Sequence, residues 1–222
     1  MQNFDLKGVK NILFDLGMVI INLDQQATEN AFKSIMGDKH DEVMTQLHQE
    51  AFFEGYETGK ISTQEFVYRI GSLIGGPAID EKIMNAWNAM LLDIPEKRFD
   101  ILLWARANYR TFCLSNTNEL HINFIYKMLQ KTKKINNLDD YFEKVYLSHE
   151  MGLRKPNEDC FEKVIQDNNL NPSETLFIDD TAGHLEGAKK VGLKTFHLNH
   201  QITLEEIFIP LKVKSDSSKK YF

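Results

Sequence analysis

Short apolar runs alternate with amphipathic stretches over most of this chain. The apolar runs are rich in Val, Ile, Leu and Phe and predict strands near Val9–Leu16, Tyr109–Leu114, Val145–Ser148, Thr175–Ile178 and Lys194–Leu198. Between them, the spacing predicts helices over Glu96–Asn108, Glu119–Lys133, Glu158–Asn168 and His184–Val191. Strands that alternate with helices are typical of a parallel sheet with crossover helices. We therefore predict an α/β fold.

Residues 23–95 break this alternation, because helical periodicity runs through them without a credible strand. The spacing of apolar residues predicts three apolar helix faces in this segment: Val43, Met44, Leu47 and Ala51; Phe66, Ile70, Leu73 and Ile74; and Ile83, Met84, Trp87 and Leu91. Ser62 with Glu65 three residues later is a capping box, which predicts that a helix begins there. We predict a helical insert over residues 23–95 within an α/β domain of residues 1–22 and 96–222.

Composition narrows the class of protein. The 222 residues are 42% hydrophobic and 26% charged, as in an ordinary globular protein. A net charge of −6 leaves no basic footprint, so we expect neither nucleic acid nor a membrane as partner. Cys113 and Cys160 are too few for a disulfide framework, and we expect two buried thiols. We expect a cytoplasmic monomer or homodimer, with Val213–Phe222 as a solvated terminus.

Reactive residue types stand at the ends of the predicted strands. Asp15 ends the first strand, Ser115 and Asn116 end the second, and the pair Asp179-Asp180 ends the fourth. The loop after the third strand contains Gly152-Leu153-Arg154-Lys155-Pro156. In an open parallel sheet, ligands bind just beyond the carboxyl ends of the strands. These positions are therefore candidates for catalysis and ligand binding.

The order Asp, Ser, Lys and paired Asp resembles the four motifs of the haloacid dehalogenase superfamily, nearly all of whose members are phosphotransferases. The flanking residues are most similar to the α-D-glucose-1-phosphate phosphatase-like branch: Phe14-Asp15-Leu16-Gly17, Leu114-Ser115-Asn116-Thr117-Asn118 and Asp179-Asp180 with Glu186-Gly187-Ala188. The resemblance covers almost the whole chain. It implies a Rossmann-like parallel sheet and a small four-helix cap inserted after the first strand.

The resemblance also implies roles for the motif residues. Asp15 would be the nucleophile that forms an aspartyl-phosphate, and Lys155 would offset the charge of Asp15 and of the phosphate. Ser115 would donate a hydrogen bond to the phosphoryl group, and Asn116 would help to bind substrate through its backbone amide.

Mg²⁺ is the cofactor that the resemblance implies, and it suits a site made of oxygen ligands. Asp15, the backbone carbonyl of Gly17 and Asp180 would hold the ion, with Asp179 as a second acidic ligand or as support through water. Gly17 would also lie against the bound substrate. A small phosphate ester is the expected ligand.

Gly17 departs from the commonest patterns of the superfamily. Most of its phosphatases carry a second Asp at this position, and haloacid dehalogenases commonly carry Tyr, whereas the sugar-phosphatase-like branch has Asp-Leu-Gly. Our leading hypothesis is a Mg²⁺-dependent phosphatase of small monoesters, including sugar phosphates such as glucose 1-phosphate. One alternative is a metal-independent haloacid dehalogenase, against which the Asp179-Asp180 pair argues. The other is a catalytically weak phosphate-ligand-binding protein, which Gly17 suggests.

Two further features could contribute to the site. The histidines near the motifs lack the spacing of a zinc site, so we interpret them as structural or rim residues: His121, His149, His184 and His197. His184 stands out because relatives usually carry Asn or Asp there. The segment Tyr56–Lys60 is either the edge of the cap that faces substrate or a plain connection between helices.

Overall fold

A computed structural model describes residues 4–74, 80–199 and 201–218. Its centre is a five-stranded parallel sheet in the order β3-β2-β1-β4-β5. The strands are β1 Asn11–Phe14, β2 Arg110–Ser115, β3 Lys144–Leu147, β4 Thr175–Asp179 and β5 Lys194–His197. The predicted strands are thus confirmed, with ends that differ by one or two residues. The α/β fold class is confirmed with them.

Helices cover both faces of the sheet because its strands are apolar on both sides. Ile12 and Phe14 of β1 pack on one face and Leu13 on the other. The first face is covered by α6 Glu96–Asn108, α7 Glu119–Lys133 and α11 Leu204–Ser218. The second face is covered by α9 Glu158–Asn168 and α10 Ala182–Lys190, and the short α8 Ser148–Met151 follows β3. Alternation along a single strand therefore builds two cores.

The C-terminal helix α11 is buried near its start and exposed at Val213. Leu204 and Phe208, four residues apart, are fully buried, and α11 packs on α6. Part of the segment expected as a solvated terminus is helical, up to Ser218, and its first residue, Val213, is 59% exposed. Residues 219–222 of that segment lie outside the described residues.

Residues 25–88 form a separate helical layer. It contains α1 Gln25–Met36, the 3₁₀ helix η1 Gly37–Lys39, α2 His40–Gln49, α3 Phe52–Glu57, α4 Thr63–Ile74 and α5 Asp80–Asn88. The described part of this layer has five α-helices where the resemblance implied four. The predicted start of α4 is present, since Ser62 Oγ accepts a hydrogen bond from the Glu65 amide at 3.1 Å.

The helical layer has a core of its own, which includes Phe32, Leu47, Phe52, Phe66 and Trp87. Its rings pack closely; the Phe52 and Phe66 rings are stacked with centroids 5.3 Å apart. The prediction was wrong for Ala51, which does not belong to this core. Ala51 is exposed and has a φ of 50° where the chain turns between α2 and α3.

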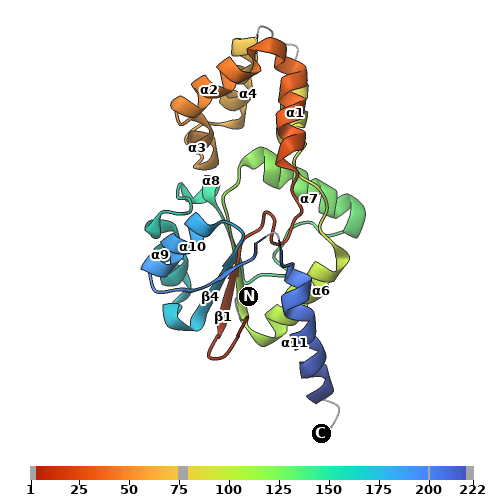
Figure 1. Cartoon of the computed structure of the whole chain (residues 1–222), viewed down its shortest axis with the longest axis vertical. Coiled ribbons are helices and arrows are strands. Elements are labelled where there is room, and N and C mark those ends of the chain that lie inside the picture. Colours follow the sequence, from red (N-terminus) through yellow and green to blue (C-terminus); the bar gives the residue numbers. More distant parts are fainter. Residues whose placement is uncertain (1–3, 75–79, 200, 219–222) are drawn as a thin grey trace.

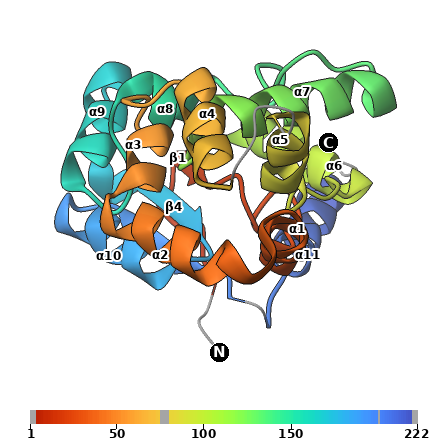
Figure 2. The same cartoon turned by 90° about the horizontal axis from the view of Figure 1, so that it is seen from above.

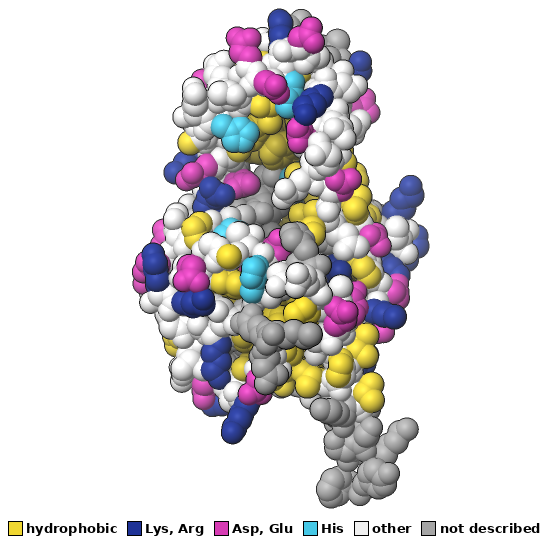
Figure 3. All heavy atoms as spheres, in the orientation of Figure 1, with side chains coloured by type: hydrophobic (Ala, Val, Ile, Leu, Met, Phe, Trp, Pro, Cys, Tyr) yellow, Lys and Arg dark blue, Asp and Glu magenta, His cyan; other side chains and the backbone are white. Residues whose placement is uncertain are grey.

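The layer and the sheet are stacked along the long axis of the molecule (Figure 1). Seen from above, α2, α3 and α4 lie on the side of β1 and β4, and α5 lies next to α7 (Figure 2). Acidic and basic side chains are interspersed over the face shown in Figure 3. Within the described residues, no helix is long and apolar enough to cross a membrane.

Candidate active site

Asp15, Lys155 and Asp179 form a buried ion-paired group where β1 and β4 end. The backbone amide of Asp15 donates to the Ile178 carbonyl at 2.9 Å, which brings Asp15 beside the end of β4. Lys155 Nζ lies 2.5 Å from Asp15 Oδ1 and 2.7 Å from Asp179 Oδ2. Only 1% of the Lys155 side chain is exposed. Removing any one of these charges would leave another buried without its partner.

Protonation equilibria of this group follow from burial and mutual attraction. Burial, and then the neighbouring Asp179, raise the pKa of Asp15 against the opposing effect of Lys155. Burial would also raise the pKa of Asp179, but Lys155 and His184 outweigh it and hold that pKa below its usual range. Burial would lower the pKa of Lys155, and the two carboxylates reverse this and raise it. Lys155 is therefore a fixed cation in the site.

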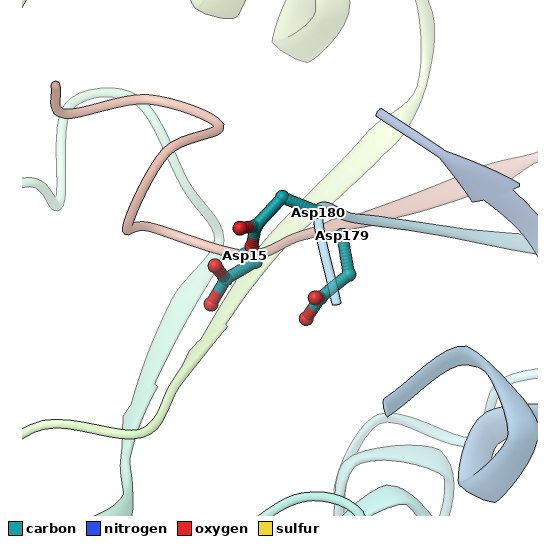
Figure 4. A group of neighbouring side chains, drawn as sticks. All are labelled: Asp15, Asp179 and Asp180. Atoms are coloured by element: carbon teal, nitrogen blue, oxygen red, sulfur yellow. The ribbon is translucent and has the colours of Figure 1, made fainter. Parts of the chain in front are cut away.

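Asp180 completes a group of three carboxylates. Asp15, Asp179 and Asp180 can each present an oxygen within 4.8 Å of the others. Figure 4 shows the Asp15 and Asp180 carboxylates next to each other and the Asp179 carboxylate directed away from them. Burial and the charge of Asp179 raise the pKa of Asp180. Three carboxylates against one ammonium leave two excess negative charges, which suits one divalent cation bound by oxygen ligands.

Asp179, the last residue of β4, and Asp180, which follows it, differ in how many hydrogen bonds each carboxylate accepts. Asp179 accepts from Lys155, from the Thr181 amide at 2.7 Å and from His184 Nδ1 at 3.1 Å. The Asp180 carboxylate has only a 3.5 Å contact with Thr181 Oγ1 among the described residues. The donor set therefore fits a metal held by Asp15 and Asp180, with Asp179 orienting Lys155 and His184.

Gly17 lies in a tight turn that follows Asp15. Its carbonyl accepts from the Val19 amide at 2.6 Å, and Met18 between them has a φ of 55°. A carbonyl oxygen has a second lone pair, so this bond leaves Gly17 able to act as a ligand. A Cβ at position 17 would lie 3.9 Å from Asp15 Oδ2 and 2.9 Å from Leu23 Cδ1. A side chain at this position would thus reach the Asp15 carboxylate.

The end of β2 supplies a free hydroxyl and an anchor for the Lys155 loop. Ser115 is 4% exposed and lines the site cavity, and its hydroxyl has no hydrogen-bond partner within the described part of the chain. The Asn116 side chain is occupied: its Nδ2 donates to the Lys155 carbonyl and its Oδ1 accepts from the Lys155 amide, both at 2.9 Å. Asn116 therefore positions Lys155 through its side chain, and the binding role expected of its backbone amide stays a prediction.

Helix α10 approaches the same loop through a glycine. A Cβ on Gly187 would lie 2.0 Å from the Pro156 carbonyl oxygen, so only glycine permits this contact. Gly183, one turn earlier on α10, has nothing within 4 Å of its would-be Cβ. The two glycines of α10 thus have different surroundings, and only Gly187 is required by a close contact.

A cavity of about 250 Å³ joins these residues to the helical layer. The apolar part of its lining includes Leu23, Trp87, Met90 and Leu91. Pockets for drug-sized ligands usually measure roughly 300–1,000 Å³. The cavity therefore suits a small molecule.

The segment Tyr56–Lys60 contributes to this cavity differently from the prediction. Glu57, at the end of α3, lines the cavity. Tyr56 is buried in the helical layer with 2% exposure, and its hydroxyl accepts from the Leu120 amide at 3.3 Å. Lys60 is exposed and does not line the cavity. One residue of the segment, Glu57, faces the site.

His121 and Trp87 form part of the cavity wall. This agrees with the interpretation of His121 as a structural or rim residue, whereas the sequence analysis placed Trp87 only on an apolar helix face. Their rings stack at 5.2 Å, and His121 Nε2 donates to the Trp87 carbonyl at 3.1 Å. Asn118 Oδ1 accepts from the Trp87 indole at 3.2 Å, and its amide group contacts His121 Nδ1 at 3.2 Å. Burial lowers the pKa of His121 to about 4. This neutral cluster joins α5 to α7.

Comparisons with known proteins identify the family of this chain and several similar proteins. The profile of the haloacid dehalogenase-like hydrolases matches residues 114–198. D-ribitol-5-phosphate phosphatase of Bacteroides thetaiotaomicron is 32% identical, over 85% of this chain and 91% of that protein. Glyceraldehyde 3-phosphate phosphatase of Pyrococcus furiosus is 26% identical, over 86% of this chain and 80% of that protein.

A solved structure is also similar. It is a HAD family enzyme from Bacteroides thetaiotaomicron in complex with magnesium and inorganic phosphate, with a TM-score of 0.81 and 36% identity. The match covers 90% of this chain and 99% of that one.

Proposed function

This chain belongs to the haloacid dehalogenase-like hydrolases, and we propose from this that it is a Mg²⁺-dependent phosphatase of small phosphate monoesters. One observation carries the proposal: Lys155 Nζ bridges Asp15 and Asp179 beside the open carboxylate of Asp180. Phosphoryl transfer needs a positioned nucleophile and positive charge around the phosphoryl oxygens. The group supplies the first directly and the second through Lys155 and a bound cation.

The reaction would proceed in two displacements at phosphorus. Lys155 occupies Asp15 Oδ1, so Oδ2 is the oxygen that attacks. A bond forms from Oδ2 to phosphorus while the bond to the ester oxygen breaks, and the leaving alkoxide takes a proton from water. Water then attacks phosphorus, and phosphate and the Asp15 carboxylate are released. Splitting the hydrolysis in this way makes each step easier.

The remaining side chains would hold the phosphoryl group. Ser115 donates its hydroxyl hydrogen to a phosphoryl oxygen, and Lys155 neutralises charge on Asp15 and on the transferring group. Asp15, Asp180 and the Gly17 carbonyl would hold Mg²⁺, which supplies further positive charge at the phosphoryl oxygens when bound. Asp179 would not hold the ion directly; it orients Lys155 and His184 beside the metal site through hydrogen bonds.

A sugar or polyol phosphate is the substrate class we propose. The relatives named for D-ribitol 5-phosphate and glyceraldehyde 3-phosphate support it, as does the small cavity. Glucose 1-phosphate stays a prediction within this class. We further propose that residues 23–95 act as a cap over the α/β domain of residues 1–22 and 96–222, since Glu57 and Trp87 line the cavity together with Asp15.

Phosphate release from 4-nitrophenyl phosphate and from D-ribitol 5-phosphate tests the proposed function. Asp15→Asn should reduce turnover on the order of 10³-fold or more, because it removes the nucleophile. EDTA should abolish turnover and added Mg²⁺ should restore it. Asp139→Asn, which changes an exposed carboxylate remote from the site, is the matched control and should retain activity.

Two results would contradict the proposal. Full activity in excess EDTA would remove the metal-dependent mechanism. Absence of phosphate release together with halide release from a 2-haloacid would favour the dehalogenase alternative, whereas phosphate binding without turnover would favour the ligand-binding alternative.

A further inference from the structure

Glu57 is the acidic side chain that the helical layer contributes to the lining of the site cavity, within the described residues. The other acidic residues of the lining, Asp15 and Asp180, come from the sheet and belong to the phosphoryl-transfer machinery. The same lining includes the apolar side chains Leu23, Trp87 and Met90, whereas the basic groups that act on Glu57 are Arg154, His184 and Lys155. Polar groups placed sparsely in an apolar pocket usually fix ligand orientation and specificity.

Contacts to the α/β domain hold Glu57 in place. Its Oε2 lies 3.0 Å from Arg154 Nη2, and Arg154 directly precedes Lys155. Two residues after Glu57, Gly59 has a φ of 69°, and a Cβ there would lie 2.2 Å from the His149 carbonyl oxygen. This close approach fixes the end of α3 against α8. Glu57 is therefore positioned by the same loop that positions Lys155.

The second oxygen of the Glu57 carboxylate remains available. Arg154 pairs with Oε2, and Oε1 has no hydrogen-bond partner among the residues that the structure describes. The Glu57 side chain is 25% exposed, and burial raises its pKa while Arg154 opposes that effect. A partly buried carboxylate oxygen gains from a hydrogen-bond donor, since burial removes part of its water.

From these contacts we infer that Glu57 is a specificity-determining residue, which selects a neutral, hydroxyl-bearing leaving group by accepting a hydrogen bond from it through Oε1. The inference rests on the proposed phosphatase function. The negative charge of Glu57 also disfavours leaving groups that carry a carboxylate or a second phosphate, since like charges in a small cavity repel. The 250 Å³ volume limits the leaving group to a few carbons. The ligand class is thus a small polyol or sugar monophosphate.

Three substrates of the purified chain with Mg²⁺ test the role of Glu57: D-ribitol 5-phosphate, n-pentyl phosphate and 4-nitrophenyl phosphate. Glu57→Ala should lower kcat/KM for the polyol ester by about 10- to 100-fold, the usual effect of losing a hydrogen bond to a charged group. The values for the pentyl and aryl esters should change less than about threefold. Glu57→Gln, which keeps an acceptor oxygen without the charge, should show an intermediate loss.

The loss of charge gives a second, independent readout. Hydrolysis of 3-phosphoglycerate, which carries a carboxylate, should increase relative to 4-nitrophenyl phosphate in both Glu57 variants. Glu54→Gln is the matched control, because Glu54 also approaches Arg154, at 3.5 Å, but does not line the cavity. It should leave all substrate ratios unchanged.

The outcomes separate this inference from the proposed function. Equal losses on all substrates in the Glu57 variants, or the same change of ratios in Glu54→Gln, would assign Glu57 a structural role and overturn the inference. If the wild type hydrolyses the aryl ester but Glu57→Ala does not change the preference among the three substrates, the inference is overturned and the proposed function stands. No phosphate release from any ester would overturn the proposed function and this inference with it.

Discussion

Gly17 leaves the candidate site without an acid-base side chain two residues after its nucleophile. A Cβ at this position would lie 3.9 Å from Asp15 Oδ2, so a carboxyl group placed here could reach the leaving oxygen. Leaving groups of low basicity need little protonation, whereas an alkoxide needs it. The wild-type protein should therefore cleave an anomeric or aryl phosphate much faster than an alkyl phosphate.

Gly17→Asp should raise turnover of an alkyl phosphate by up to about 10²-fold and leave the aryl ester nearly unchanged. The Leu23 methyl group 2.9 Å from the new Cβ is the end of a flexible side chain and can move aside. Gly17→Asn is the matched control, because it has the same size and cannot donate a carboxyl proton. Steady-state rates on both substrates decide the matter; fast alkyl hydrolysis by the wild type would show that another group already supplies the proton.

At the scale of elements, helix α10 holds the loop of Lys155 in place through its contact at Gly187. Gly187→Ala would force its Cβ against the Pro156 carbonyl, with the would-be contact at 2.0 Å. Backbone does not yield as easily as a side chain, so the helix and the loop must separate. We expect a loss of about 1–3 kcal/mol in the free energy of unfolding and a fall in kcat.

Gly183→Ala on the same helix is the comparison that isolates this contact. Nothing lies within 4 Å of its would-be Cβ, and Ala favours a helix over Gly by at most about 1 kcal/mol. This variant should be as stable as the wild type or slightly more so, with unchanged activity. Denaturant unfolding and kcat of both variants measure the difference; equal behaviour would show that the α10 contact does not position Lys155.

At the scale of the whole molecule, His121 links the helical layer to the α/β domain. Burial lowers its pKa to about 4, from an ordinary value of 6.5. Between these pH values the unfolded chain binds a proton at His121 and the folded chain does not, so folding stability rises with pH there. The contribution of neutral His121 to the free energy of unfolding is complete above pH 6.5 and is lost as the pH falls towards 4. Its size is roughly 3 kcal/mol at most.

His121→Gln should remove this part of the pH dependence. The variant should be less stable than the wild type at pH 7, because the stacking on Trp87 is lost. The difference in the free energy of unfolding between wild type and variant should decrease by roughly 3 kcal/mol from pH 6.5 to pH 4, because the wild type loses the stabilisation from its neutral histidine. Urea unfolding at several pH values measures this difference; a difference that stays constant would contradict the assignment of His121 as a neutral buried base.

Much of the α/β architecture follows from local sequence signals. The bounds predicted for α6, α7 and α9 match the structure, since amphipathic periodicity and neighbouring caps act within one element. Asn118, for example, accepts from the His121 amide at the start of α7. The four motif positions could also be predicted as one site, because parallel strands place their carboxyl ends at one edge of the sheet.

Tertiary structure alone decided the features that depend on contacts distant in sequence. No local signal shows that Tyr56 turns into the helical layer while Glu57 faces the cavity, because this depends on Leu120 and Arg154. Likewise α11 carries Pro210 and a polar end, and burial of Leu204 and Phe208 against the sheet outweighs both. Periodicity records which residues are apolar, whereas the partner that each side chain meets is set by packing between elements.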